Sequence, residues 1–166
     1  MLQRLSTQRP SDANAARRLT EALLTLGRFR EAREAASRAL ALDPRDRATR
    51  ARVEQINEAL ALDPTLRGLL PPTRLRRSAD LLARVLQDVD ECIAALPTER
   101  HTDWSDLRAR ATSAIAAKPA KPRETDALDA VTYQRLATVD ELWRLRQTTC
   151  GPTDGPVAWV AEHLAR

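Results

Sequence analysis

Apolar residues recur every three or four positions along this chain, in segments that end at glycine or proline. Leucines follow this spacing in residues 13–26, and alanines follow it in residues 30–42. Such spacing gathers the apolar side chains on one face of an α-helix. Gly27 separates the two segments, and Pro44 ends the second because proline cannot continue a helix. The pattern therefore predicts a helical hairpin over these two segments.

The hexapeptide Ala-Leu-Ala-Leu-Asp-Pro occurs twice, at residues 39–44 and 59–64. The copies are only 20 residues apart, which leaves room for one helix and not for a second hairpin. Residues 46–62 keep helical spacing through Val53 and Ile56, so we predict a single helix here. A lone helix of this kind is typical of the capped end of a stack of helical hairpins.

Residues 65–72 hold Gly68 and the pair Pro71-Pro72, which favour a linker with an abrupt change of direction. Helical spacing then returns in a long segment whose apolar residues, from Leu75 to Leu96, repeat over about three heptads. A seam of this kind is typical of a bundle face within one chain, and also of coiled-coil pairing between chains. Three further segments keep helical spacing. The four segments are residues 72–96, 103–117, 126–149 and 156–165.

These elements together predict an all-α fold in two parts. Residues 1–64 would hold the hairpin with its capping helix over 46–62, and residues 65–166 would form a four-helix unit. The composition agrees, because the chain has only 4 glycines and 3% aromatic residues and is rich in alanine, leucine, arginine and glutamate, which are strong helix formers. We expect no β-sheet.

The net charge of the 166 residues is +4, and 25 of the 27 basic residues are arginines. They alternate with aspartate and glutamate, which is typical of solvated helix faces and disfavours a specific nucleic-acid partner. No apolar run reaches the length of about 18 residues that a membrane-spanning helix needs, so we expect no membrane insertion. The N-terminus also lacks the apolar core of a signal peptide.

The hairpin also follows a longer pattern, in which small or apolar residues stand at set positions of both helices and a proline closes the unit. The positions that follow it are Leu19, Ala32, Ala39, Pro44 and the turn Gly27-Arg28-Phe29. In these features residues 13–46 resemble a tetratricopeptide repeat, a helix–turn–helix unit of about 34 residues. The positions that depart from the family pattern are Ala16, Thr20 and Ala36.

The resemblance extends over about residues 1–64, and Pro10 precedes Pro44 by 34 residues, which is the family's period. Residues 1–12 can therefore be the last turns of an earlier repeat. They can equally be an ordinary N-terminal turn, with Ser11 or Asp12 capping the helix that follows.

Tetratricopeptide arrays act as protein-interaction scaffolds whose ligands usually lie on a concave surface lined by the first helix of each repeat. The resemblance implies that the helix over residues 13–26 binds a protein or peptide partner in this way. The family's clamp for C-terminal carboxylates is not implied, because it needs Lys and Asn where this chain has Arg17 and Glu21. The residues that would face the partner are Asn14, Arg17, Glu21, Leu24 and Thr25.

Two groups of arginines form a candidate anion patch. If they shared one face, their guanidinium groups could bind phosphates or acidic peptides bidentately. Asp43, Asp46 and Asp80 lie close to them in sequence, and the alternative is that these carboxylates pair with the arginines at the surface. The members of the patch are Arg45, Arg47, Arg50, Arg52, Arg74 and Arg77.

The chain offers few groups for catalysis. Its only soft metal ligands, Cys92, His101, Cys150 and His163, are 9, 49 and 13 residues apart, which fits no zinc pattern. It has no glycine-rich phosphate loop, and no turn that offers an oxyanion hole beside a nucleophile. We therefore predict no metal, no cofactor and no catalytic residue, and we expect that the chain is not an enzyme.

The two cysteines lie near the ends of two helices. Cys92 precedes the end of the helix over 72–96 by one turn, and Cys150 ends the helix over 126–149. In an up-down-up arrangement these helices run parallel and finish at the same end of the bundle. This predicts a candidate disulfide, which would indicate an oxidising compartment, periplasmic or secreted. The alternative is two free thiols, with Cys92 in the apolar seam, and a cytoplasmic location.

We therefore expect a non-enzymatic protein–protein interaction or scaffold module that forms the C-terminal part of a larger repeat protein. One alternative is a structural cap or dimerisation domain, which would use the long helix over 72–96. Another is the accessory domain of an enzyme whose catalytic part lies outside this chain. The sequence identifies neither the partner nor the oligomeric state.

Overall fold

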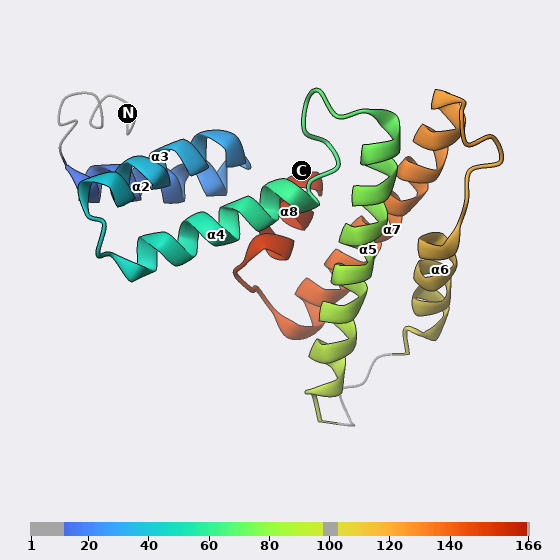
Figure 1. Ribbon diagram of the computed structural model, residues 1–166. Helices are drawn as coiled ribbons and strands as arrows, with labels where there is room; N and C mark the ends of the chain where they lie inside the picture. Colours follow the sequence, from blue (N-terminus) through green and yellow to red (C-terminus); the bar gives the residue numbers. More distant parts are fainter. Residues whose placement is uncertain (1–11, 98–102, 166) are drawn as a thin grey trace. The chain divides into compact units, whose positions relative to one another are not determined.

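The computed structural model describes residues 12–97 and 103–165, and within these ranges the fold is all helical, as predicted (Figure 1). The described ranges contain seven helices and no strand, and each helix begins and ends within two residues of the expected bounds. Residues 1–11, which include the start of the predicted repeat segment, lie outside the described ranges. The helices are α2 (Ala13–Thr25), α3 (Phe29–Leu42), α4 (Arg47–Leu62), α5 (Pro71–Ala94), α6 (Ser105–Ala116), α7 (Thr125–Cys150) and α8 (Pro156–Leu164).

The chain divides into two compact units, residues 1–61 and residues 62–166. The predicted boundary after residue 64 is three residues later than the observed one. The second Asp-Pro pair therefore belongs to the second unit.

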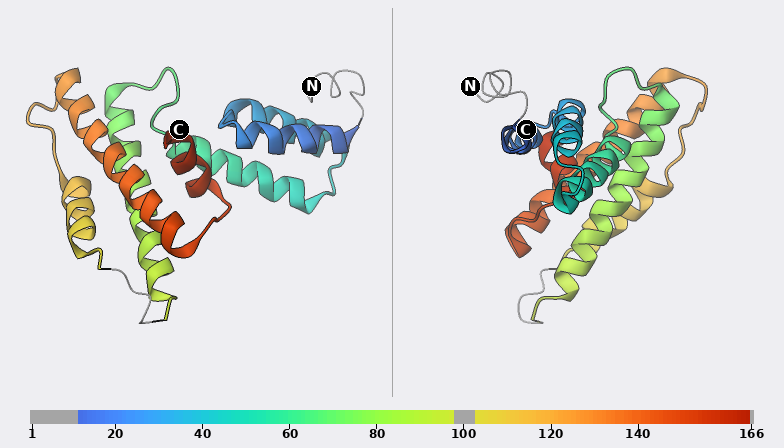
Figure 2. Two further views of the ribbon diagram at one scale, coloured as in Figure 1. Left: turned by 180° about the vertical axis from the view of Figure 1, so that it is seen from behind. Right: turned by 60° about the vertical axis from the view of Figure 1, so that its left-hand side comes forward.

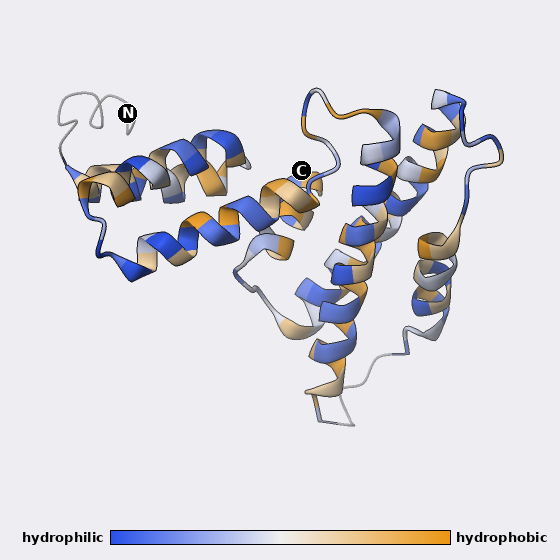
Figure 3. Ribbon diagram, in the orientation of Figure 1, coloured by the Kyte–Doolittle hydropathy of each residue, from blue (hydrophilic) through white to orange (hydrophobic). Residues whose placement is uncertain are grey.

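The first unit is built on the hairpin of α2 and α3, which lie side by side in both views of Figure 2. The carboxylate of Asp12 caps α2, where it accepts hydrogen bonds from the backbone N–H groups of Asn14 and Ala15 at 2.9 and 3.1 Å. Gly27 follows the last turn of α2 with a positive φ of 69°, a conformation that costs glycine little. On both helices the apolar residues lie mainly on one face and the polar residues on the other (Figure 3).

Small side chains hold this hairpin together. On α3 the buried residues are four alanines and Phe29, and small residues let two helix backbones approach closely. On α2, Thr20 is also buried, and its hydroxyl donates a hydrogen bond to the carbonyl of Ala16 at 3.0 Å. This hydrogen bond within the helix compensates the cost of removing the hydroxyl from water.

The second unit is a bundle in which α5 and α7 run parallel. Near the start of both helices Arg74 Nη2 donates to Asp129 Oδ1 at 2.7 Å, and near their ends Arg146 Nε donates to Asp88 Oδ2 at 3.0 Å. The residue numbers of the pairs rise together along both helices, which only a parallel arrangement allows. Figures 1 and 2 show the two helices side by side.

Helix α6, which lies between α5 and α7 in the sequence, runs antiparallel to both and contacts both. Its first turns lie beside the end of α5, where Arg108 Nε donates to Asp90 Oδ1 at 2.9 Å. Its last residues lie beside the first half of α7, where Arg135 donates to the carbonyl of Ala114 at 2.9 Å. The bundle therefore has the predicted up-down-up course.

The apolar face of α5 differs from the predicted heptad seam. Leu75 and Leu86, both in the predicted seam, are only half-buried, whereas Leu81 and Val85 are fully buried. The reason is that α5 packs against α6, α7 and α8, so its buried face is wider than the stripe of a two-helix coiled coil.

Candidate functional site

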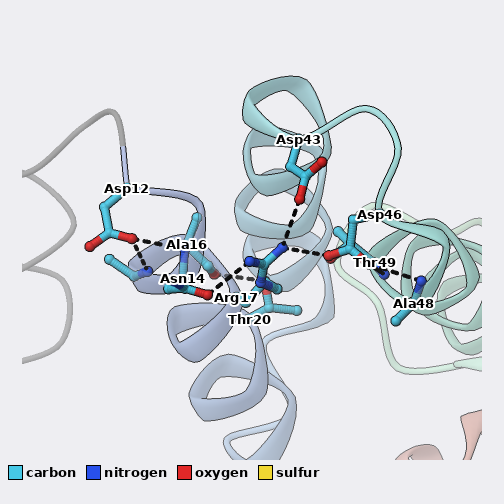
Figure 4. A network of polar contacts seen from close by, with 10 residues as sticks. Asp12, Asn14, Ala16, Arg17, Thr20, Asp43, Asp46, Ala48 and Thr49 are labelled. Atoms are coloured by element: carbon cyan, nitrogen blue, oxygen red, sulfur yellow. Dashed lines mark hydrogen bonds and ion pairs between the residues drawn. The ribbon is translucent and has the colours of Figure 1, made fainter.

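The predicted partner-binding helix α2 carries a polar network that joins it to the start of α4 (Figure 4). Arg17 lies at its centre. One guanidinium nitrogen donates to Asn14 Oδ1 at 2.8 Å, and the other donates to Asp46 Oδ2 and lies 3.7 Å from Asp43 Oδ2. A single side chain therefore connects α2, the end of α3 and the beginning of α4.

Asp46 has two roles in this network. Besides pairing with Arg17 it caps α4, because its carboxylate accepts hydrogen bonds from Ala48 N, Thr49 N and the Thr49 hydroxyl. The bonds from the Thr49 hydroxyl and N–H, followed by the contact with Arg17, hold the pKa of Asp46 below its ordinary value of 3.8. The charged form of Asp46 is thus favoured in the folded state.

The lowered pKa of Asp46 predicts an acid-dependent contribution to the stability of residues 1–61. A carboxylate with a depressed folded-state pKa stabilises the fold above its unfolded value, and this stabilisation is lost as the pH falls through the folded value. We expect Asp46→Asn to melt at a lower temperature than the wild type at pH 7, because asparagine can cap α4 but carries no charge, so its bonds from Thr49 and its contact with Arg17 are weaker. The measurement is thermal denaturation by circular dichroism from pH 7 down to below 3.8.

The difference between wild type and Asp46→Asn should shrink as the pH falls, because Asp46 becomes protonated. Glu34→Gln, which changes an exposed carboxylate on α3, serves as the control and should show no such trend. A difference for Asp46→Asn that stays constant over the whole pH range would contradict the assignment.

A second ion pair also ties α2 to α4. Arg52 Nε lies 3.1 Å from Glu21 Oε1, and Arg52 Nη1 donates to Gln55 Oε1 at 3.2 Å. Two of the predicted partner-binding residues, Arg17 and Glu21, are therefore already paired within the protein. Both remain partly accessible, with 34% and 56% of their side-chain surfaces exposed.

The structure corrects one member of the predicted partner-binding face. Leu24 is only 7% exposed and cannot reach a partner without a change of structure. The reason is that α2 packs on α3 and is also tied to α4, so its buried stripe includes both Leu23 and Leu24. Asn14 and Thr25 are exposed. The accessible strip of α2 is therefore Asn14, Arg17, Glu21 and Thr25.

The predicted anion patch is distributed over both units and is largely engaged. Arg52 pairs with Glu21, Arg50 donates to the carbonyl of Pro44 at 2.8 Å, Arg74 pairs with Asp129 and Arg77 donates to the carbonyl of Asp63 at 3.0 Å. Arg45 and Arg47 are exposed beside the start of α4. Four of the six arginines are thus held within the protein, and Arg52 and Arg74 pair with carboxylates, but these are Glu21 and Asp129 rather than Asp43, Asp46 or Asp80.

The structure joins the two cysteines, Cys92 on α5 and Cys150 on α7, in a disulfide with a Cα–Cα distance of 6.3 Å. This distance lies within the range of about 4.4–6.8 Å that disulfide geometry requires. Both residues are half-buried, and both lie in the last turn of their helices.

Two buried arginines on α7 were not anticipated from the sequence. Arg135 is only 4% exposed and donates hydrogen bonds to backbone carbonyl groups alone, at 2.8–3.1 Å. Burial lowers the pKa of its guanidinium, and the charge of Asp80 partly offsets this effect. The carbonyl groups are those of Leu75 on α5 and of Ala114, Ile115 and Ala117 at the end of α6.

The second buried arginine, Arg146, lies near the disulfide. Its guanidinium donates to Asp88 and to the carbonyl of Gly151, and it lies 5.7 Å from the ring centroid of Trp143. Both arginines occur at positions that continue the apolar spacing of α7. The only sequence signal for their burial was an arginine at an otherwise apolar position of the stripe. That signal is weak, because charged residues are rarely buried without partners.

The described residues contain no group of three or more His, Cys, Asp and Glu side chains placed to hold a metal ion. His101 lies outside the described ranges, and the two cysteines are bonded to each other. None of the helices in the described ranges combines the length and the apolarity that crossing a membrane requires.

Comparison of the chain with protein-family models, with curated proteins and with solved structures finds no match. The functional inference therefore depends on the geometry of the chain itself.

Proposed function

We propose that residues 12–61 act as a non-enzymatic protein–protein interaction module related to tetratricopeptide repeats, and that the accessible strip of α2 binds a polypeptide. The observation that carries this proposal is the arrangement of that strip. Asn14 and Thr25 are exposed at its two ends, and Arg17 and Glu21 are partly exposed between them. Because ion pairs to α4 hold the two charged side chains, the strip is ordered before any partner arrives, which lowers the entropic cost of binding.

The packing of the hairpin supports the same proposal. Ala16, Thr20 and Ala36, which depart from the family pattern, are all buried, and each is a small residue. Small residues at these positions suit a closely packed hairpin, in which the helix axes approach closely. Helix α4 then adds a third helix, as the first helix of a following repeat would.

The charges along the strip indicate the chemistry of the partner. Arg17 and Arg52 face three carboxylates, those of Glu21, Asp43 and Asp46. Within the strip Glu21 is more exposed than Arg17, so a free carboxylate would be repelled there. A peptide with basic side chains, or one that offers backbone amides, complements this surface.

Nucleic acid is the less favoured partner. Arg45 and Arg47 are exposed, but most of the other patch arginines already have protein partners. Two guanidinium groups can neutralise only a few phosphates, which supports salt-sensitive and nonspecific contact at most. The proposal of a dimerisation domain is weakened likewise, because the apolar face of α5 packs mainly within its own bundle.

The double variant Asn14→Arg with Thr25→Arg tests the proposal. Both side chains are exposed, so we expect the fold to remain helical by circular dichroism while capture of polypeptide partners in a pull-down falls at least tenfold. The added positive charges would repel a basic peptide, and the larger side chains would block the strip. Ser37→Arg, which adds one positive charge at an exposed position of α3 against the two of the double variant, is the control and should retain the partners.

A partner set that is the same for the double variant, for Ser37→Arg and for the wild type would remove the α2 strip from consideration. Equal loss in the double variant and in Ser37→Arg would indicate a general effect of charge and would also contradict a site on α2.

A further inference from the structure

Helices α5 and α7 are joined near their C-terminal ends by two successive contacts. The first is the ion pair of Asp88 with Arg146, and the second is the disulfide of Cys92 with Cys150. On each helix the second contact lies four residues beyond the first, which is one helical turn. The two contacts therefore set the separation of α5 and α7 over their last turns.

Helix α8 depends on this separation because it packs against both long helices. It follows α7 after only five residues and buries Ala158, Val160 and Ala161. Trp143 of α7, which is 1% exposed, lies with Gln147 beside Glu162 of α8. A helix of 9 residues is not stable alone in water, so α8 owes its stability to the surface that α5 and α7 form together.

We propose that oxidation of Cys92 and Cys150 is the maturation step that seats α8 on the bundle. In the dithiol form only the Asp88–Arg146 pair of these two contacts remains, the turns beyond that pair can separate, and the surface that receives α8 is incomplete. Formation of the bridge fixes the separation and completes that surface. The chain is thus a substrate for a disulfide donor.

The reaction balances as a thiol–disulfide exchange. A thiolate of one cysteine attacks the disulfide of the donor, which forms a mixed disulfide and releases one donor thiol. The second cysteine loses its proton and attacks the mixed disulfide, which closes the Cys92–Cys150 bond and releases the second donor thiol. The two cysteines lose two electrons and two protons in total, and the donor gains them.

The position of the bridge favours its persistence. Both cysteines lie in the last turn of a helix, where the negative end of the helix dipole disfavours a thiolate. A reductant must expel one of these sulfurs as a thiolate, so reduction is slowed. The bridge therefore acts as a lasting modification of a chain that folds in an oxidising compartment.

The rest of the bundle has contacts that do not require the bridge. Arg146 holds both Asp88 and the carbonyl of Gly151, and the other ends of the long helices are joined by Arg74 with Asp129. Loss of the bridge should therefore act locally, on α8 and the last turn of α7, and should leave α6 and the first half of α7 in place.

Hydrogen exchange measured by mass spectrometry on the full chain tests this. Three samples are compared at low temperature: the oxidised wild type, the wild type reduced with dithiothreitol, and Cys92→Ser with Cys150→Ser. We expect amides in residues 156–165 to exchange at least tenfold faster in the second and third samples. Amides in residues 105–116 and 125–140 should stay protected in all three samples, and any rise in their rates should be uniform over both ranges, as expected when only the free energy of global unfolding has fallen.

Addition of dithiothreitol to the double serine variant is the control and should change nothing. Equal protection of residues 156–165 in all three samples would overturn the proposal, since α8 would then be seated without the bridge. Loss of protection throughout residues 71–164 in the two unbridged samples would overturn it as well, because the bridge would then hold the whole bundle rather than the seat of α8.

Discussion

Replacement of Arg135 with methionine is expected to lower the free energy of unfolding of residues 62–166 by about 1.5–3 kcal/mol. The side chain is buried and donates to carbonyl groups at the end of α6 and to that of Leu75 on α5. Methionine fills a similar length but offers no donor, so these carbonyl groups lose a partner, that of Ala114 in a buried bond and the others in part-buried ones. Urea denaturation followed by circular dichroism measures the loss.

Arg144→Met is the matched control on the same helix. Arg144 is 69% exposed and pairs with Asp140 at 2.6 Å across one turn, so its loss should cost no more than about 0.5 kcal/mol. Arg135→Lys should recover only part of the loss at Arg135, because one ammonium group cannot reproduce the planar set of guanidinium donors. A value for Arg135→Met that matches the control would show that α6 does not depend on this arginine.

Removal of the disulfide is expected to lower the free energy of unfolding of the same unit by about 4 kcal/mol. The bridge closes a loop between residues separated by 58 positions, and opening it restores conformational freedom to the unfolded chain. The comparison is denaturation of the wild type with and without reductant, together with Cys92→Ser with Cys150→Ser. Reductant should have no effect on the double variant.

Intact-mass analysis accompanies this experiment. Reduction of the oxidised protein should add the mass of two hydrogen atoms, as two thiols replace the bridge. A mass that reduction does not change, in protein purified without reductant, would contradict the disulfide and favour the alternative of two free thiols.

The helices were predictable because their signals are local. Apolar spacing, the glycine after α2 and the prolines at helix ends act within a few residues of the chain, and these determine where a helix begins and ends. The parallel course of α5 and α7 followed as well, because a single intervening helix returns the chain to its starting end.

Burial of particular side chains was harder to predict. Leu24 was expected to face a partner, yet it is buried because α2 is covered by more than one neighbour. Arg135 and Arg146 carry a charge that ordinarily keeps a side chain at the surface. Their burial depends on acceptors that lie on other helices, and nothing in the local sequence of α7 marks those acceptors.

The two copies of Ala-Leu-Ala-Leu-Asp-Pro distinguish what the local sequence determines from what the tertiary structure determines. In both copies the sequence alone ends a helix, because the residue before proline is disfavoured in helical conformation. The environments nevertheless differ, since Leu42 is 40% exposed whereas Leu62 is 7% exposed.

The two aspartates of these copies show the physical reason. Asp43 stays partly exposed and approaches Arg17, whereas Asp63 is 2% exposed and accepts hydrogen bonds from the backbone N–H and hydroxyl of Thr65 at 2.8 and 2.7 Å. A carboxylate is buried only where such donors compensate its lost hydration. The sequence by itself thus determined the helices and their ends, and the tertiary structure decided which of two identical segments became part of the core.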